Sequence, residues 1–447
     1  MVDDIGQWKR THYSKDVTSG LDGKKVIVMG WARALRGGGA LKFIQLSDRE
    51  GFVQITAKKG IVSDNIITKI ESLNREDVLA VEGTVKAAKE APNGFEIIPI
   101  DIRVLSKAET PLPLEIVTKK TDAEISTRFD SRFIDLRKPE IMAIFNIKDA
   151  VTTATRNFLE NDGFVEIHTP KIIAEASEGG AEVFKIKYFD REAYLAQSPQ
   201  FYKQTMMAAG FDRVYEIGSA FRAEKSHTTR HVAEILMLDM EMSFINSVED
   251  VMNVVEKLMF EICTFVNKNE EKSLKILNKK IEIPKMPFPR ITLDEAKKLL
   301  EKKGLSYKQP NEEINFAGEK ALCEIIKEKY GHEFVFLTEF PWSEAKFYHK
   351  QNITNPKVAE RCDLLYNGVE IATITQREHR YDILLKQVKK DKVNPEKIKF
   401  YLDAFRYGMP PHGGAGIGID RIVQQLLALS SVQEAVLFPR TSERITP

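Results

Sequence analysis

Residues 221–244 form a stretch whose charged side chains could bind phosphate groups. Arg222 and Glu224 come first, a polar turn follows, and Arg230 and His231 lead into the returning half. Apolar and polar side chains alternate there, which predicts two antiparallel strands joined by a polar loop. Arginines and carboxylates would then share one face of a sheet, as a site for phosphates and a magnesium-type cation requires. A solvated hairpin with surface ion pairs is the alternative.

Length and composition place this stretch in a globular chain with more than one domain. The chain has 447 residues, of which 43% are hydrophobic and 29% are charged, and such a length predicts about two or three domains. The 66 basic and 65 acidic residues leave a net charge of +1. Charge alone therefore neither predicts nor excludes a nucleic-acid partner.

Cysteine usage and hydropathy indicate a reducing compartment. Cys263, Cys323 and Cys362 are far apart and include no CxxC pair, which argues against a disulfide framework or a zinc site. The first residues, MVDDIGQWKR, contain no apolar signal segment, and the chain has no run of about 18 apolar residues. We therefore expect a cytoplasmic protein with no membrane partner.

Five short apolar alternations between residues 24 and 102 predict a small β-barrel over residues 1–108. Glycines separate the alternations, as tight turns demand, and this pattern is typical of the OB fold, which binds oligonucleotides on one face. Phe43 could supply a stacking plane for a base, and Gln54 and Glu96 could supply hydrogen bonds to its edge. A core position is the alternative for Phe43.

The remainder of the chain is predicted as a linker and one larger domain. Residues 109–138 contain two early prolines and a polar sequence, which favours a linker or hinge. Pro139 then opens a helix whose apolar residues recur at steps of three and four up to Asp162. Residues 292–330 are predicted as a helical insertion in the domain that covers residues 139–447.

Polar residues recur where this domain changes from one element to the next. Glu178 lies beside a glycine pair that predicts either a lid or a surface turn. Gln200 and Lys203 lie where a strand passes into a helix. These positions suit side chains that line a site.

Two C-terminal segments add further candidates. A predicted strand at residues 368–380 carries Glu370, Thr373 and Arg377. A glycine cluster then precedes a helix that contains Arg421, with a spacing that matches neither a Walker loop nor a dinucleotide fingerprint. The glycines bring backbone close to another group, and Arg421 strengthens the prediction of an anion site.

Taken in order, these motifs resemble those of class II aminoacyl-tRNA synthetases of the aspartyl, asparaginyl and lysyl subgroup, most closely the aspartyl branch of archaeal and eukaryotic type. The resemblance covers the barrel, a first motif ending at Pro170, a second from Phe221, a third through Arg421, and the closing LFPRTSERITP. It implies an α+β catalytic domain with an antiparallel β-sheet flanked by helices. It also implies a homodimer formed largely through the first motif.

The resemblance implies that the central motifs bind ATP and Mg²⁺. Arg222 would bridge the α-phosphate and the amino-acid carboxylate, and Arg421 would contact the γ-phosphate, so these two are the expected catalytic residues. Glu370 and Thr373 would hold Mg²⁺, although the family usually has serine at the second position. The implied ATP-binding set is Arg222, Ala223, Glu224, Arg230, His231, Val232, Glu370, Gly418, Ile419, Asp420 and Arg421.

The amino acid implied by the resemblance is L-aspartate. Lys203 and Arg377 would pair with its second carboxylate, and a neutral amide in its place would leave two buried cations unpaired. Glu178 would hold the α-amino group. The implied aspartate set is Glu178, Gln200, Lys203, Arg222, Thr373 and Arg377.

The implied activity is ATP-dependent formation of aspartyl-adenylate, followed by transfer of the aspartyl group to the 3' end of tRNA(Asp). The barrel would read the anticodon through Phe43, Gln54, Glu96 and Arg33. Arg33 lies where discriminating relatives often carry an aromatic residue, which favours tRNA(Asn) as a second substrate.

Three departures from the family pattern leave other functions open. Ile235 stands where the family usually has a phenylalanine that stacks on adenine, a contact worth roughly 0.5–1.5 kcal/mol. Ile374 and Thr375 occupy positions that are usually small or glycine, and their extra bulk would reshape the pocket floor. The alternatives are an asparaginyl enzyme, a tRNA-binding paralogue without catalysis, and a ligase for small-molecule synthesis, which would have no use for the barrel.

Overall fold

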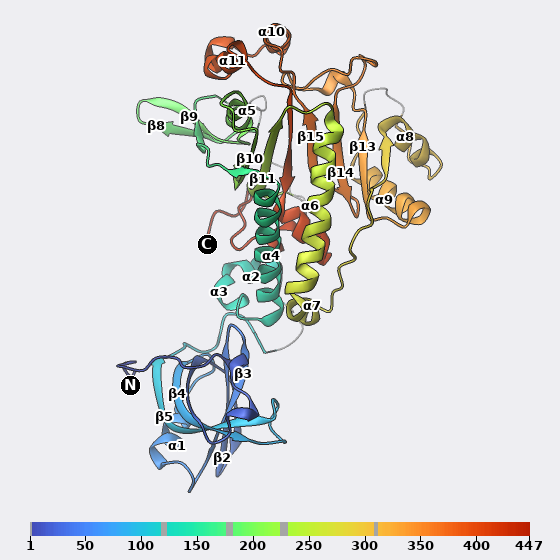
Figure 1. The fold of residues 1–447 in the computed structure, drawn as a ribbon. Coiled ribbons are helices and arrows are strands. Elements are labelled where there is room, and N and C mark those ends of the chain that lie inside the picture. Colours follow the sequence, from blue (N-terminus) through green and yellow to red (C-terminus); the bar gives the residue numbers. More distant parts are fainter. Residues whose placement is uncertain (1, 118–122, 176–181, 224–230, 308–311) are drawn as a thin grey trace. The chain divides into compact units, whose positions relative to one another are not determined.

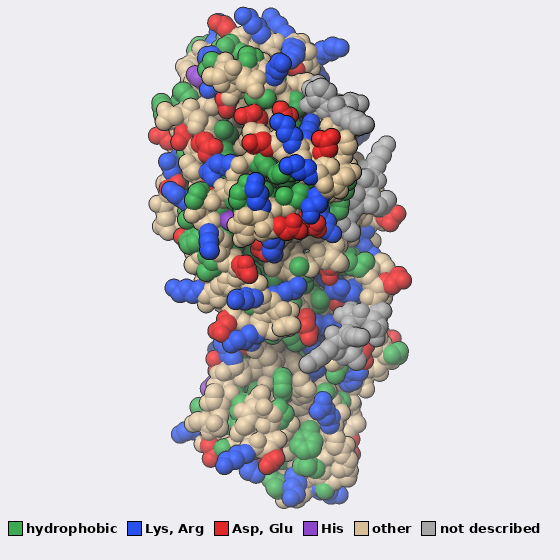
Figure 2. Space-filling view, turned by 90° about the vertical axis from the view of Figure 1, so that its right-hand side faces the viewer, with side chains coloured by type: hydrophobic (Ala, Val, Ile, Leu, Met, Phe, Trp, Pro, Cys, Tyr) green, Lys and Arg blue, Asp and Glu red, His purple; other side chains and the backbone are tan. Residues whose placement is uncertain are grey.

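The computed structural model describes residues 2–117, 123–175, 182–223, 231–307 and 312–447. The chain divides into two compact units, Met1–Ile141 and Met142–Pro447, whose elements are labelled in Figure 1. Basic and acidic side chains are interspersed over the face in Figure 2, in line with the nearly neutral net charge.

The first unit contains the predicted five-stranded closed barrel. Its strands pair in the order β1-β2-β3-β5-β4 around an apolar core, and Ile44, Ile55 and Leu79 are fully buried in it. The elements are β1 (Lys25–Gly38), β2 (Leu41–Asp48), β3 (Gly51–Lys58), α1 (Asp64–Glu71), β4 (Val78–Ala87) and β5 (Phe95–Ser106). This arrangement confirms the OB-type barrel.

The segment predicted as a linker contains two short helices, α2 (Ile125–Asp130) and α3 (Arg132–Asp135). Asp135 is fully buried and accepts hydrogen bonds from Arg128 and Arg132. Its neighbour Arg137 donates to Glu76 of the barrel at 2.8 Å. The segment is therefore partly ordered by ion pairs rather than being a simple spacer.

The second unit is built on an eight-stranded sheet with the order β12-β13-β14-β15-β16-β11-β10-β6. Neighbours from β13 to β10 are antiparallel, as predicted, whereas the edge strands β12 and β6 join in parallel. The sheet strands are β6 (Val165–Glu166), β10 (Arg213–Phe221), β11 (Glu234–Ser243), β12 (Arg290–Thr292), β13 (Phe334–Thr338), β14 (Arg361–Tyr366), β15 (Val369–Gln376) and β16 (His412–Gly418).

Helices flank this sheet, and a small three-stranded sheet lies beside it (Figure 1). The small sheet consists of β7 (Ile172–Ile173), β8 (Lys185–Tyr188) and β9 (Arg191–Leu195). The helices are α4 (Pro139–Asn161), α5 (Gln200–Ala208), α6 (Val248–Asn269), α7 (Glu271–Leu277), α8 (Leu293–Glu301), α9 (Phe316–Tyr330), α10 (Tyr381–Lys390), α11 (Lys399–Arg406) and α12 (Ile419–Leu427). Within the described ranges, none of the helices is long and apolar enough to cross a membrane.

Local sequence explains where several of these helices begin. Pro139 opens α4, because a proline at the first helical position loses no hydrogen bond. Reciprocal capping boxes start α6 at Ser247 with Asp250 and α8 at Thr292 with Glu295. Helices α8 and α9 lie in the segment predicted as a helical insertion and share an apolar core with β13.

Candidate functional site

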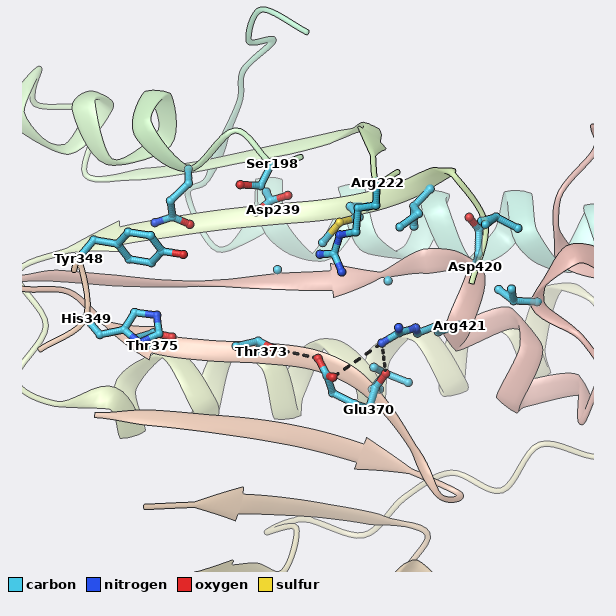
Figure 3. Close-up of a pocket in the computed structure, with 18 of the residues that line it drawn as sticks. Ser198, Arg222, Asp239, Tyr348, His349, Glu370, Thr373, Thr375, Asp420 and Arg421 are labelled. Carbon is cyan, nitrogen blue, oxygen red and sulfur yellow. Dashed lines mark hydrogen bonds and ion pairs between the residues drawn. The ribbon is translucent and has the colours of Figure 1, made fainter. Parts of the chain in front are cut away.

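A cavity of about 200 Å³ opens over the centre of the large sheet. Figure 3 shows Tyr348, His349 and Thr375 at one end of it and Arg222, Glu370, Asp420 and Arg421 at the other. Thr373 lies between the two groups. We call the first the amino-acid end and the second the nucleotide end, after the ligands that the resemblance implies for their residues.

Strand register aligns the charged residues across this sheet. Asp239 of β11 pairs with Gly416 of β16, which pairs with Thr373 of β15. One step along, Glu241 pairs with Gly414, and Gly414 pairs with Thr375. Because residues two apart on a strand face the same side, these rows share one face.

The glycines of β16 make room for these side chains. A Cβ atom at Gly414 would lie 2.1 Å from Glu241 Oε2 and 2.1 Å from the Met240 carbonyl oxygen. At Gly416 it would lie 3.2 Å from the Met237 terminal methyl carbon. The cluster in the sequence therefore brings backbone against carboxylates and the cavity floor, not against a Walker-type phosphate.

Glu241 lies between the two cations predicted to recognise the amino acid. Arg377 donates to its carboxylate from Nε at 3.0 Å and from Nη2 at 3.3 Å, and Lys203 Nζ lies 3.4 Å from Oε2. All three side chains are buried. Burial raises the pKa of Glu241, but the charges of Arg377 and Lys203 outweigh burial and hold that pKa below its usual value.

Arg377 lines the cavity, whereas Lys203 lies one layer behind it. Lys203 donates to Asp239, a lining residue, at 2.9 Å and to the carbonyl oxygens of Met240 and Ala415 at 3.3 Å. Gln200 also lines the cavity and is buried. The structure thus brings the predicted pair together and places Asp239 between Lys203 and the ligand space.

Behind Glu241 is a buried hydrogen-bond network. The Gln204 amide nitrogen lies 2.9 Å from His412 Nε2, and Gln204 Oε1 accepts hydrogen bonds from Tyr401 and Gln200. His412 Nδ1 is 2.8 Å from the Pro410 carbonyl oxygen, so Nδ1 carries the proton and Nε2 accepts. Burial lowers the pKa of His412 to about 4, although the charge of Glu241 acts in the opposite direction.

At the nucleotide end, Arg421 is oriented by Glu370. Its Nη1 donates to the Glu370 carbonyl oxygen at 2.8 Å and lies 3.8 Å from Glu370 Oε2. Arg222, at the end of β10, lines the same cavity (Figure 3). Two guanidinium groups around one space suit an oligophosphate.

Oxygen atoms of Glu370 and Thr373 fit a Mg²⁺ ion. Thr373 Oγ1 donates to Glu370 Oε1 at 2.8 Å, and Asp363 is the strand partner of Thr373. Burial, together with the charge of Glu370, raises the pKa of Asp363 to about 7 despite its ion pair with Arg361. Hard oxygen donors of this kind suit Mg²⁺. Among the described residues, no group of three or more His, Cys, Asp or Glu side chains forms a complete metal cage.

Asp420 has a structural partner on each side. Lys148 of α4 lies 2.5 Å from its Oδ1, and its Oδ2 accepts from the Leu236 backbone nitrogen at 3.0 Å. These contacts join α4, β11 and α12 beside the cavity. Asp420 lines the cavity wall, but its oxygens already have protein donors.

Only some of the other residues predicted to bind ATP line the cavity. Val232 and Gly418 line it, whereas Ile419 is fully buried and is not part of the lining. The Ala223 backbone nitrogen donates to the Glu182 carbonyl oxygen, and His231 is half-buried outside the lining. The predicted residues Glu178, Glu224 and Arg230 lie outside the described residues.

The three departures from the family pattern occupy different places. Ile235 lines the cavity, where it presents an aliphatic rather than an aromatic surface. Thr375 also lines it, but Ile374 between Thr373 and Thr375 is fully buried on the opposite face. Ile374 therefore does not form the cavity floor.

On the barrel, Phe43 and Gln54 line a shallow hollow. Arg36, Gln45, Phe52 and Pro92 complete much of its wall. Glu96 lies 3.8 Å from Lys86 outside this lining. Arg33 is buried, lies 2.9 Å from Glu76, and donates to the Arg137 carbonyl oxygen, so it also lies outside the hollow.

Several site residues escaped the sequence prediction. Asp239 and Glu241 had a signal, because they alternate with apolar residues on β11. Tyr348 and His349 lie in a loop with no periodic pattern, and Gln204 is one turn beyond Gln200. Their roles depend on contacts between distant parts of the chain.

Comparison with known proteins identifies both units. Residues 124–442 match the family model for class II tRNA synthetases (D, K and N), and residues 26–105 match an OB-fold nucleic acid binding domain. An aspartate–tRNA(Asp) ligase of Pyrococcus abyssi is 50% identical, over 98% of this chain and 100% of that protein. An aspartate–tRNA(Asp/Asn) ligase of Methanococcus aeolicus is 44% identical, over 99% of each chain.

Solved structures agree in fold. Asparaginyl-tRNA synthetase of Pyrococcus horikoshii, complexed with asparaginyl-adenylate, has a TM-score of 0.91 and 32% identity, over 98% of this chain and 100% of that one. Aspartyl-tRNA synthetase of Entamoeba histolytica has a TM-score of 0.87 and 31% identity, over 98% and 93% of the two chains.

Proposed function

This chain belongs to the class II tRNA synthetases of the D, K and N group, a family of ligases, and from that premise we propose that it activates L-aspartate with ATP and transfers it to tRNA(Asp). Curated relatives at 43–50% identity are aspartate–tRNA ligases, some of them for tRNA(Asp/Asn). In this chain, the side chains that line the cavity would bind the substrates and promote the reaction.

The orientation of Arg377 is the observation that favours aspartate as the amino-acid substrate. Glu241 occupies its Nε and Nη2, and Nη1 has no hydrogen-bond partner among the described residues. A lining guanidinium with one open edge offers a charge-assisted donor to the side-chain carboxylate of aspartate. Lys203 adds positive charge from behind Asp239.

Asparagine is disfavoured at this position by its amide group. A carboxylate presents only acceptors, whereas an amide presents an NH₂ donor that cannot accept from a guanidinium. Arg377 is already paired with Glu241, so the cost of asparagine is a buried Nη1 donor left without an acceptor when the NH₂ group faces it. Because the chain is also similar in structure to an asparaginyl enzyme, an experiment must distinguish aspartate from asparagine as the substrate.

In the first step, the α-carboxylate of aspartate attacks the α-phosphorus of ATP, and pyrophosphate leaves as that phosphorus–oxygen bond breaks. Arg222 would neutralise charge at the α-phosphate, and Arg421, fixed by Glu370, would hold the γ-phosphate. The reaction needs alignment and charge neutralisation rather than a protein nucleophile. In the second step, a ribose hydroxyl at the 3' end of tRNA attacks the activated carbonyl and AMP leaves.

Glu370 and Thr373 would hold Mg²⁺, which supplies charge neutralisation to the phosphates when bound. Burial raises the pKa of Glu370, but the charge of Arg421 and the Thr373 hydrogen bond outweigh burial and hold that pKa below its usual value, which favours the ionised form that Mg²⁺ would need. Chelation should therefore abolish exchange, and Mg²⁺ should restore it. Activity that persists under exhaustive chelation would contradict this role.

The barrel would bind the anticodon through the hollow lined by Phe43 and Gln54. An aromatic face beside amide groups suits an unpaired base. Charging of purified tRNA(Asp) and tRNA(Asn) would determine whether one or both are substrates. A strong preference for tRNA(Asp) would identify a discriminating enzyme.

The edge strand β6 supports a homodimer. It forms one end of the large sheet, and the side chains of Val165 in the first motif and of Ile172, just beyond Pro170, are exposed. A second copy would cover this apolar edge. Analytical ultracentrifugation should find a dimer, and Val165→Lys should weaken it.

Amino-acid-dependent exchange of pyrophosphate into ATP tests the proposed activity. Aspartate should support exchange and asparagine should not at equal concentration. Arg377→Gln should lose aspartate-dependent exchange while the fold is retained. Exchange with asparagine alone would show an asparaginyl enzyme, and no exchange with any amino acid, combined with tRNA binding, would show a non-catalytic paralogue.

A further inference from the structure

His349 has no assigned role, yet its imidazole lines the amino-acid end of the cavity (Figure 3). The side chain is 5% exposed, and its Nδ1 atom has no hydrogen-bond partner within the described part of the chain. A buried polar atom without a partner carries a free-energy cost, so it calls for an explanation. Because the ring lines the cavity, the position favours a ligand group as the missing hydrogen-bond partner of Nδ1.

The backbone around His349 fixes the imidazole beside Arg377. The backbones of His349 and Arg377 pair in an isolated antiparallel β-bridge, and the Glu378 backbone nitrogen donates to the Tyr348 carbonyl oxygen at 3.0 Å. Gln387 of α10 donates to the carbonyl oxygens of Phe347 and His349. The segment is therefore held from both sides, and its side chain position is set by the same strand end that positions the guanidinium.

Burial and the charges around His349 both favour the neutral form of its ring. Burial lowers its pKa well below the usual value, and Arg377, Arg361 and Lys346 lower the pKa further. A neutral imidazole has one N–H donor and one acceptor. Three nearby cations would also attract an anionic ligand group to this end.

We propose that His349 is a specificity-determining residue that donates its Nδ1 hydrogen to the side-chain carboxylate of bound aspartate, next to Arg377. The inference rests on the proposed function, because it assumes that aspartate occupies this end. The carboxylate has two oxygens, so Arg377 Nη1 and His349 Nδ1 can each be satisfied by one ligand. An asparagine amide offers one acceptor oxygen and an NH₂ group, and it cannot satisfy both donors.

Two substitutions separate the hydrogen bond from the packing of the ring. His349→Leu removes the donor but keeps a side chain that fills part of the same space, whereas His349→Gln keeps an N–H donor. We expect His349→Leu to raise the KM for aspartate about tenfold, as loss of a hydrogen bond to a charged group predicts. We expect His349→Gln to recover most of that loss, and the KM for ATP to stay within about twofold in both variants.

His379→Gln is the matched control. His379 also has a buried Nδ1 without a partner in the described ranges, and its pKa is also lowered by burial, but it is not part of the cavity lining. Its substitution should leave both KM values within about twofold. A general effect of losing a buried histidine would change them in this variant too.

The outcomes distinguish this inference from the proposed function. Wild-type exchange with aspartate establishes the function independently of His349. If the wild type exchanges but His349→Leu has an unchanged KM for aspartate, the inference is wrong and the function stands. Equal increases in the KM for aspartate and for ATP, or no recovery with glutamine, would show that His349 acts only through packing.

Discussion

Glu241 accepts two hydrogen bonds from Arg377, from Nε at 3.0 Å and from Nη2 at 3.3 Å, and both side chains are buried. The pair is an anchor for the guanidinium, because two parallel bonds fix both its position and its plane. Its third nitrogen is thereby directed to the space in which we place the substrate.

Glu241→Gln tests this anchor. The variant leaves Arg377 and Lys203 with one fewer counter-charge, and breaking a buried ion pair in this way costs about 3 kcal/mol. We expect the free energy of unfolding to fall by about that amount and the KM for aspartate to rise. At equal concentration, aspartate should raise the melting temperature of the variant less than that of the wild type, because a ligand that binds more weakly stabilises the folded state less.

Glu256→Gln is a control for the loss of a buried carboxylate elsewhere in the same unit. Glu256 lies 3.4 Å from Arg290 and is remote from the cavity lining. This variant should lose stability without any change in the KM for aspartate. An unchanged KM in Glu241→Gln as well would mean that Arg377 needs no anchor.

Gly414→Ala tests the close approach of β16 to β11. The added methyl group would overlap Glu241 Oε2 and the Met240 carbonyl oxygen, and backbone cannot easily retreat within a central strand. We expect a loss of about 2 kcal/mol or more in stability, measured by denaturant unfolding, and a large loss of aspartate-dependent exchange. Gly38→Ala, where a Cβ meets nothing within 4 Å, should change neither by much.

Much of the fold and part of the site could be predicted from local sequence. Period-two alternation on β11 placed Asp239 and Glu241 on one face, and the glycine cluster indicated a close backbone approach. Neither pattern could show that the group approached at Gly414 is the carboxylate of Glu241. That contact depends on the register between two strands that are far apart in the sequence.

Residues that act through tertiary contacts were harder to predict. Lys203 matched a family motif, but its position behind Asp239 follows from how α5 packs on β11. Ile374 was expected to change the pocket floor, and strand alternation turns it to the opposite face. His349 lies in a loop without periodicity, so only the assembled cavity reveals it.

His412 should make stability depend on pH. Its folded pKa of about 4 is below the unfolded value of about 6.5, so the unfolded chain binds more protons between these values. Stability should therefore fall as pH decreases from about 6.5 to 4, by up to about 3 kcal/mol from this group. In His412→Asn this contribution should vanish, so the variant should lose less stability than the wild type over the same range.

Urea unfolding of both proteins at a series of pH values measures that difference. Other groups titrate in the same window, but they are common to both proteins and cancel in the comparison. Parallel pH dependence in the two proteins would mean that the folded pKa of His412 is not lowered from its unfolded value. His332→Asn, which removes a buried histidine with two backbone partners between α9 and β13, is the matched control for loss of a buried ring.

Phe43→Ala should separate the two steps of the proposed reaction. Pyrophosphate exchange needs only the cavity of the second unit, whereas charging also needs the tRNA held by the barrel. Stacking of a base on an aromatic side chain is worth about 1–3 kcal/mol, so the KM for tRNA should rise about tenfold and exchange should keep its rate. Phe43 is half-buried and lines the barrel hollow, so the variant should also unfold near the wild-type temperature. A large fall in melting temperature with an unchanged KM for tRNA would identify Phe43 as a core residue and move the anticodon contact elsewhere on the barrel.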